Sequence, residues 1–116
     1  IEISESAIRD AQKNCQKSQV RHCQFIRGDI KTGLKQIREK TNVMIADPPR
    51  AGMHEDVVKA ILAMAPPRIV YVSCNPATLA RDLLRLTEKY HVAEIQPVDL
   101  FPHTYHIECV VRLDLI

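Results

Sequence analysis

The sequence predicts an α/β fold with a mostly parallel sheet, helices on both faces and an antiparallel last strand. Short β-branched runs alternate along the chain with stretches of helical periodicity, which is typical of parallel strands joined by crossover helices. The last two predicted strands, near 92–98 and at 106–113, are separated only by a loop, so they form an antiparallel pair. Polar residues follow several predicted strands at the edge where open α/β sheets bind ligands.

Length and composition limit the class of protein. The chain has 116 residues, 46% of them hydrophobic, so we expect residues 1–116 to form one globular domain. A net charge of +2 is too small to indicate nucleic-acid binding by itself. No apolar run approaches the roughly 20 residues of a membrane span, so no membrane partner is expected. The four cysteines form no C-x-x-C pair, and the composition is that of a cytoplasmic protein with reduced thiols.

The first part of the chain contains two predicted strands, each followed by a helix. Residues 1–3 have the pattern of the end of a buried strand, and Ser4 is a suitable cap for the helix that follows. The run 22–26 is the second predicted strand. A short helix, roughly 33–40, leads to a third strand at 42–46.

The second part begins with a turn, Asp47–Gly52, whose two adjacent prolines cannot continue a helix or a strand. A helix around 54–64 follows and is ended by a second pair of prolines. The β-branched run 69–72 predicts a buried strand, and a helix over 76–89 follows it.

Cys74 lies between the predicted strand 69–72 and the helix that follows. Asn75 is a good N-cap, and Pro76 suits the first helical position, where no backbone N–H is needed. The positive end of a helix favours an anion beside it, so this position suits a nucleophilic thiolate. The alternative is a buried structural cysteine, the commoner role of a single cysteine.

Acidic residues follow the first three predicted strands, namely Glu2, Asp29 and Asp47. Glu108 lies near the start of the last strand, which runs the other way, so all four carboxylates are expected at one edge of the sheet. His106 is two residues from Glu108 and shares its predicted strand face. Glu2 is a candidate for binding a ribose diol or for capping a helix, and Asp29 for ligand contact or an ordinary turn.

A metal site is not expected. His103 and His106 suggest one together with Glu108, but the alternation of a strand separates the two histidines, and a catalytic metal needs about three ligands.

Three segments together resemble the catalytic domain of the RNA uracil-5-methyltransferases, which use S-adenosylmethionine. They are Asp47–Gly52, Ser73–Asp82 and Asp99–Glu108, in this order and with fitting spacing. Glu2–Ser4 and Gly28-Asp29 resemble the cofactor-binding segments of the same family. The resemblance implies a partial catalytic domain with a Rossmann-like methyltransferase fold that lacks its first strand.

The resemblance also implies a role for each polar residue. Cys74 corresponds to the nucleophile that adds to C6 of uracil, and Glu108 to the base that removes the C5 proton. Glu2 and Asp29 correspond to contacts with the ribose and adenine of S-adenosylmethionine. Asp47 corresponds to a residue at the junction of cofactor and base.

Substrate contacts are expected from Arg50, Phe101 and His106. Arg50 is a candidate for stabilising charge on uracil O4 or for binding a backbone phosphate. Phe101 and Tyr105 are candidates for stacking on a base, with a role in the core as the alternative.

The RNA partner is expected to be large-subunit ribosomal RNA, because segments 77–82 and 101–104 look more like that branch of the family; transfer RNA is the alternative. Two further classes stay open: an exocyclic-amine nucleic-acid methyltransferase, in which an aromatic residue usually replaces Arg50, and a non-catalytic fragment. An iron–sulfur cluster, which some members carry, would have its ligands upstream.

We expect the 116 residues alone to have little or no activity, because the Gly-rich cofactor loop of the family should lie upstream of Ile1. Calorimetry of the isolated chain with S-adenosylmethionine is expected to show weak binding. A micromolar dissociation constant would contradict this expectation.

Overall fold

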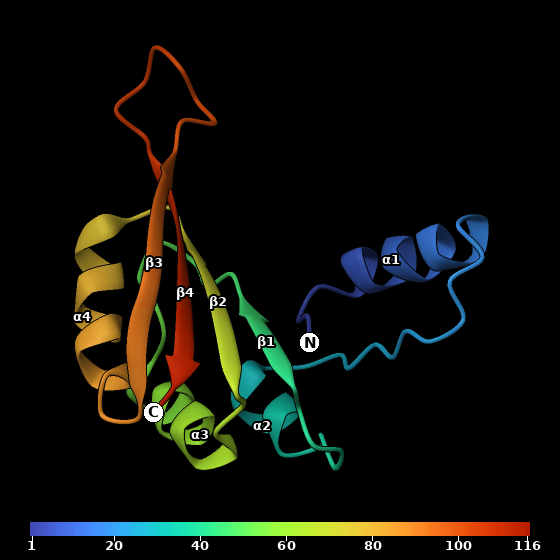
Figure 1. The fold of residues 1–116 in the computed structure, drawn as a ribbon. Coiled ribbons are helices and arrows are strands. Elements are labelled where there is room, and N and C mark those ends of the chain that lie inside the picture. The colour runs from blue at the N-terminus through green and yellow to red at the C-terminus, as the bar shows by residue number, and fades with distance from the viewer. The chain divides into compact units, whose positions relative to one another are not determined.

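The computed structural model describes all residues from 1 to 116, and they form two compact units, Ile1–Glu39 and Lys40–Ile116 (Figure 1). The two units are described separately below. The assignment of the whole chain to one domain stays a prediction. None of the helices combines the length and the apolarity needed to cross a membrane.

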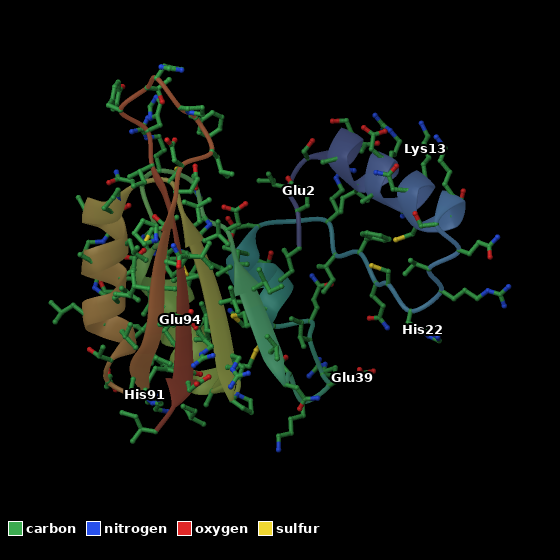
Figure 2. The ribbon with its side chains drawn as sticks, turned by 45° about the horizontal axis from the view of Figure 1, so that its top comes forward. Glu2, Lys13, His22, Glu39, His91 and Glu94 are labelled. Atoms are coloured by element: carbon green, nitrogen blue, oxygen red, sulfur yellow. The ribbon has the colours of Figure 1, made fainter.

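The first unit is built around helix α1 (Glu5–Lys17), which confirms the helix predicted after Ser4 (Figure 2). The Ser4 hydroxyl accepts a hydrogen bond from the backbone N–H of Ala7 at 3.3 Å, so Ser4 caps the helix as its residue type predicts. Glu5 in the first turn and Lys17 in the last complement the helix dipole.

The two predicted strands of this unit, 1–3 and 22–26, are not formed, and both predictions were wrong. Only an isolated parallel bridge joins Glu2 to Arg27. The two isoleucines of the first segment are 43% and 69% exposed, so no buried face supports a strand there. A strand also needs a ladder of several pairs, which one bridge does not supply.

The second helix of this unit, α2, spans Ile30–Leu34 instead of the predicted 33–40. The Asp29 carboxylate accepts a hydrogen bond from the backbone N–H of Lys31 at 2.8 Å, and this cap sets the start of the helix three residues earlier than predicted.

The second unit contains a four-stranded sheet with two helices (Figure 1). Its elements are β1 (Val43–Ala46), α3 (Glu55–Met64), β2 (Arg68–Ser73), α4 (Pro76–Leu86), β3 (Tyr90–Val98) and β4 (Glu108–Leu115). The strand order is β1-β2-β4-β3, with β1 parallel to β2 and β4 antiparallel to both of its neighbours. Three strands therefore share one direction and only the last opposes them, which confirms the predicted α/β class.

The core lies between one face of this sheet and the helices α3 and α4. Ile69 and Tyr71 of β2 are fully buried, and so are their cross-strand partners, Leu113 and Val111 of β4. Burying each such side chain contributes about 1.5–3 kcal/mol. Right-handed crossovers in one direction along a sheet put both helices on the same face, and α3 and α4 contact each other there.

The opposite face of the sheet carries no helix of this unit. Val43 and Ile45 of β1 are on that face and are 51% and 74% exposed. Within residues 40–116, helices therefore cover one of the two faces for which they were predicted.

Candidate active site

Cys74 lies in a tight turn between the end of β2 and the start of α4. The buried Ser73 hydroxyl accepts a hydrogen bond from the N–H of Asn75 at 3.1 Å and donates one to its carbonyl oxygen at 3.0 Å. The Asn75 side chain accepts from the N–H of Ala77 at 3.0 Å and caps α4. Both neighbours of Cys74 are thus held, and its half-buried thiol lies at the positive end of the helix.

Cys109 is a structural cysteine and differs from Cys74 in its burial. It is only 8% exposed, on the helix-covered face of β4, and burial raises the pKa of its thiol. Cys74 is more accessible than Cys109, as a nucleophile must be.

Glu108 is brought next to Cys74 by the pairing of β2 with β4. The last pair of this antiparallel ladder is Ser73 with Cys109, so one further step along the two chains sets Cys74 beside Glu108. Glu108 is the first residue of β4 and is half-buried. The backbone positions of Cys74 and Glu108 therefore lie side by side at one edge of the sheet.

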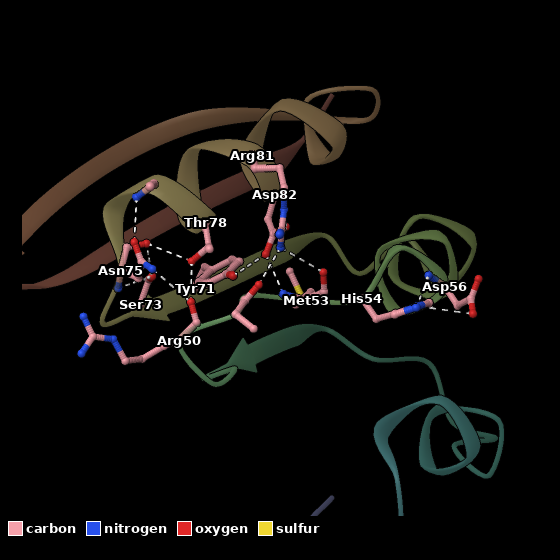
Figure 3. Close-up of polar contacts among 12 residues, drawn as sticks. Arg50, Met53, His54, Asp56, Tyr71, Ser73, Asn75, Thr78, Arg81 and Asp82 are labelled. Atoms are coloured by element: carbon pink, nitrogen blue, oxygen red, sulfur yellow. Dashed lines mark hydrogen bonds and ion pairs between the residues drawn. The ribbon is translucent and has the colours of Figure 1, made fainter.

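Asp47 and Arg50 belong to the turn that follows β1 at this same edge. Ala46, the last residue of β1, pairs with Tyr71 of β2, and the exposed Asp47 comes directly after it. The carbonyl oxygen of Arg50 accepts hydrogen bonds from α4, while its guanidinium extends away from these contacts (Figure 3).

Phe101 and His106 lie together in the loop between β3 and β4. The His106 ring is 4.3 Å from the Tyr105 ring and 6.5 Å from the Phe101 ring, between centroids. Phe101 is 51% exposed and Tyr105 is 86% exposed, so neither has the core role that was the alternative. The prediction that His106 belongs to the last strand was wrong, because β4 begins only at Glu108.

Glu2 and Asp29 are neighbours within the first unit. The backbone N–H of Gly28 donates to the carbonyl oxygen of Glu2 at 3.0 Å, which sets Asp29 close to Glu2. One oxygen of each carboxylate accepts a local backbone hydrogen bond, from Ser4 at 2.7 Å and from Lys31 at 2.8 Å. Each carboxylate keeps a second oxygen that can accept a hydroxyl of a ligand.

No group of three or more His, Cys, Asp or Glu residues is placed to hold a metal ion.

A buried charged network beside this site was not predicted from the sequence. Asp82 of α4 is 0% exposed and accepts hydrogen bonds from the N–H of Met53 and the hydroxyl of Tyr71, both at 2.7 Å (Figure 3). Arg81 pairs with the same carboxylate at 2.8 Å. A sequence signal existed: Thr78 and Asp82 are four residues apart and interrupt the apolar face of α4 with polar side chains.

Because of this network, we expect two tyrosine-to-phenylalanine substitutions to lower the free energy of unfolding by different amounts. Burial and the hydrogen bond to Asp82 raise the pKa of Tyr71, so its hydroxyl stays protonated and donates to a charged acceptor. Tyr71→Phe is expected to lower the free energy of unfolding by about 2 kcal/mol, because it removes a donor from a buried carboxylate. Tyr90→Phe, which loses a 2.8 Å bond to the carbonyl of Pro66, should cost about 1 kcal/mol.

Urea denaturation of both variants measures the two costs. Tyr90 is the matched control, because it is equally buried but its hydroxyl bonds an uncharged acceptor. Equal losses of unfolding free energy would contradict the claim that the hydrogen bond from Tyr71 is stronger because its acceptor is the carboxylate of Asp82.

Comparison with known proteins identifies the relatives of this chain. The family model described as tRNA (uracil-5-)-methyltransferase matches residues 1–115. An RNA methyltransferase of Bacteroides thetaiotaomicron is 53% identical over 99% of this chain, and one of Nitratidesulfovibrio vulgaris is 48% identical over 97% of it. The chain covers 26% and 25% of these two proteins, so it spans about a quarter of their length.

Solved structures agree with the fold. The tRNA (uracil-54, C5)-methyltransferase of Pyrococcus abyssi, in complex with S-adenosyl-L-homocysteine, superposes with a TM-score of 0.83 at 39% identity. The match covers 96% of this chain and 27% of the archaeal one. An rRNA methylase of Streptococcus thermophilus superposes with a TM-score of 0.73 at 11% identity over 98% of this chain and 70% of that one, a likeness of fold alone.

Proposed function

The chain belongs to the tRNA (uracil-5-)-methyltransferase family, and we propose that the protein containing it methylates C5 of uridine in RNA with S-adenosylmethionine. The observation that carries this proposal is the strand register that sets the half-buried Cys74 beside the half-buried Glu108 at one sheet edge. Addition to a pyrimidine ring needs a nucleophile and a base on adjacent positions, and these two residues supply them.

The cofactor is supported by the carboxylates of Glu2 and Asp29 and by the Pyrococcus abyssi enzyme, which was solved with S-adenosyl-L-homocysteine. Carboxylate oxygens accept hydrogen bonds from the ribose hydroxyls of a nucleoside, and Asp29 lies close enough to Glu2 to contact the same ligand. S-adenosylmethionine supplies an electrophilic methyl group on a sulfonium. Asp47 is assigned to the junction between this ligand and the uracil.

The first chemical role belongs to Cys74. Uracil C5 is a poor nucleophile, and addition of the thiolate to C6 converts the ring to an enolate whose C5 is nucleophilic. Negative charge then develops on O4 of the ring and needs a donor or a cation beside it. Arg50 supplies that cation in this proposal, because its guanidinium is exposed at the same sheet edge.

The second role belongs to Glu108. After methylation, its carboxylate takes the proton from C5, the C5–C6 double bond re-forms, and the electron pair of the C6–S bond returns to Cys74 as thiolate. This step releases the RNA from the protein.

The loop between β3 and β4 is assigned to the uracil. A uracil stacked in a helix is out of reach, so the base must come from a loop or be flipped out of its stack. The rings of Phe101 and Tyr105 are exposed, and each neighbours the ring of His106. Exposed aromatic rings of this kind are suited to stack on an extruded base.

Covalent trapping tests this chemistry against that of an exocyclic-amine methyltransferase. RNA containing 5-fluorouridine is expected to form a denaturation-resistant complex with the whole protein when S-adenosylmethionine is supplied, because the base cannot remove fluorine from C5. Methylation of RNA without any such complex would overturn the proposed function in favour of amine chemistry, which needs no thiol.

The class of RNA is a finer question with evidence on both sides. Segments 77–82 and 101–104 favour large-subunit ribosomal RNA, whereas the 39% identity to an archaeal tRNA enzyme favours transfer RNA. Mass spectrometry of 5-methyluridine in purified ribosomal and transfer RNA, with and without the gene, decides between them. Loss of the modification from one pool identifies the substrate.

A further inference from the structure

The backbone of the turn after β1 is held by side chains of α4. Four backbone groups of residues 50–53 are bonded in this way (Figure 3). The carbonyl of Arg50 accepts from the Thr78 hydroxyl at 3.0 Å and from the Asn75 amide at 3.2 Å. Arg81 donates to the carbonyls of Ala51 and Met53 at 2.9 and 3.3 Å, and Asp82 accepts from the N–H of Met53.

Gly52 shows how closely the turn and the helix approach. Its φ of +75° is in the region that favours glycine. A Cβ at this position would lie 2.5 Å from Nη2 of Arg81 and 2.6 Å from Oδ2 of Asp82. The turn therefore packs so closely against α4 that a side chain at position 52 would displace Arg81 and Asp82.

The same helix begins directly after the nucleophile. Asn75 both caps α4 and bonds the turn, so Cys74 at one end and residues 50–53 at the side are attached to one rigid element. The same turn carries Asp47 and Arg50, both of which are exposed.

We propose that Thr78, Arg81 and Asp82 are positioning residues, which hold the 47–53 turn so that Asp47 and Arg50 stay aligned with Cys74. This inference rests on the proposed function. Reacting groups must be held near their productive geometry, and a displacement of about 1 Å lowers rates by about a hundredfold. The hydrogen bonds of α4 supply that constraint for the turn, and the three residues act through it rather than on the uracil.

The test compares Thr78→Val and Arg81→Met with two controls in the whole protein. Thr78→Val keeps the shape of the side chain and removes the hydroxyl, whereas Thr78→Ser keeps the hydroxyl. Leu84→Ala alters α4 at a side chain that is 78% exposed and supplies none of the hydrogen bonds to the turn. Three quantities are measured: kcat for RNA methylation, amide hydrogen exchange of residues 50–53, and the midpoint of thermal unfolding.

Thr78→Val is expected to lower kcat about tenfold and to speed exchange in the turn about fivefold, which is the loss of one hydrogen bond. Arg81→Met loses two hydrogen bonds to the turn and should have larger effects on both quantities. The unfolding midpoint of Thr78→Val should move by less than about 4 °C, whereas that of Arg81→Met should fall further, because this variant leaves the buried Asp82 carboxylate without its ion pair. Thr78→Ser and Leu84→Ala should match the wild type. A role in stability alone would shift the midpoint without the separate loss of kcat.

Two results would overturn the inference, and they differ from failure of the proposed function. Unchanged exchange in both variants would mean that α4 does not hold the turn. Normal kcat with faster exchange would mean that holding it does not serve catalysis. A wild-type protein that methylates no uridine would instead overturn the proposed function itself, and the positioning role with it.

Discussion

Cys74→Ala is expected to abolish both uridine methylation and covalent trapping on 5-fluorouridine RNA. Without sulfur at this position no adduct forms at C6, and C5 of uracil stays too weak a nucleophile to be methylated. The rate should fall by at least about 10⁴-fold, to the limit of detection. Methyl transfer from radioactive S-adenosylmethionine and gel electrophoresis of the trapped complex measure the two losses.

The control for this substitution is Cys23→Ala. Cys23 is an exposed free cysteine outside the sheet unit, so its loss should leave both activities at the level of the wild type. If Cys74→Ala kept a substantial methylation rate, the nucleophile would be another group and the proposed mechanism would be wrong.

Glu108→Gln is expected to trap the protein on ordinary uridine RNA. Addition by Cys74 and methylation do not need the carboxylate, but glutamine cannot take the C5 proton, so the methylated adduct persists. Turnover should fall by about 10²- to 10⁴-fold while a covalent protein–RNA complex accumulates without any fluorinated base. Denaturing electrophoresis detects the complex, and mass spectrometry locates the methylated uridine joined to Cys74.

Glu94→Gln serves as the matched control. Glu94 lies on the neighbouring strand β3, its carboxylate is 62% exposed, and it pairs with Arg112 at 3.6 Å away from the thiol. It should turn over normally and form no lasting adduct. Release of product by Glu108→Gln at the wild-type rate would assign the base to another residue.

The sheet unit was largely predictable because its signals are local. Apolar runs rich in β-branched residues predicted β1 and β2, and the cap formed by Asn75 with Pro76 predicted the start of α4 at the residue where it begins. In the first unit the same reasoning failed for segment 22–26. A strand is stable only when it pairs with a neighbouring strand and buries one face, and a short apolar segment supplies neither by itself.

The candidate active site was likewise predictable in part, in its residue types more than in their arrangement. Residue types and their spacing predicted which groups are reactive, since the thiol, the Pro-Pro turn and the acid at 108 can each be read within a few residues. Their meeting at one sheet edge was also predicted, but the strand order that pairs the start of β4 with the end of β2 could not be read.

The chain alone determined where α1 and α4 begin, because capping and periodicity act over a few residues, and it supplied the residue types on which the proposed chemistry rests. Only tertiary structure set β4 between β2 and β3, which places Glu108 beside Cys74. It alone also buried Asp82 against the turn after β1. Strand order and burial depend on contacts between residues far apart in sequence, and these contacts leave little local pattern.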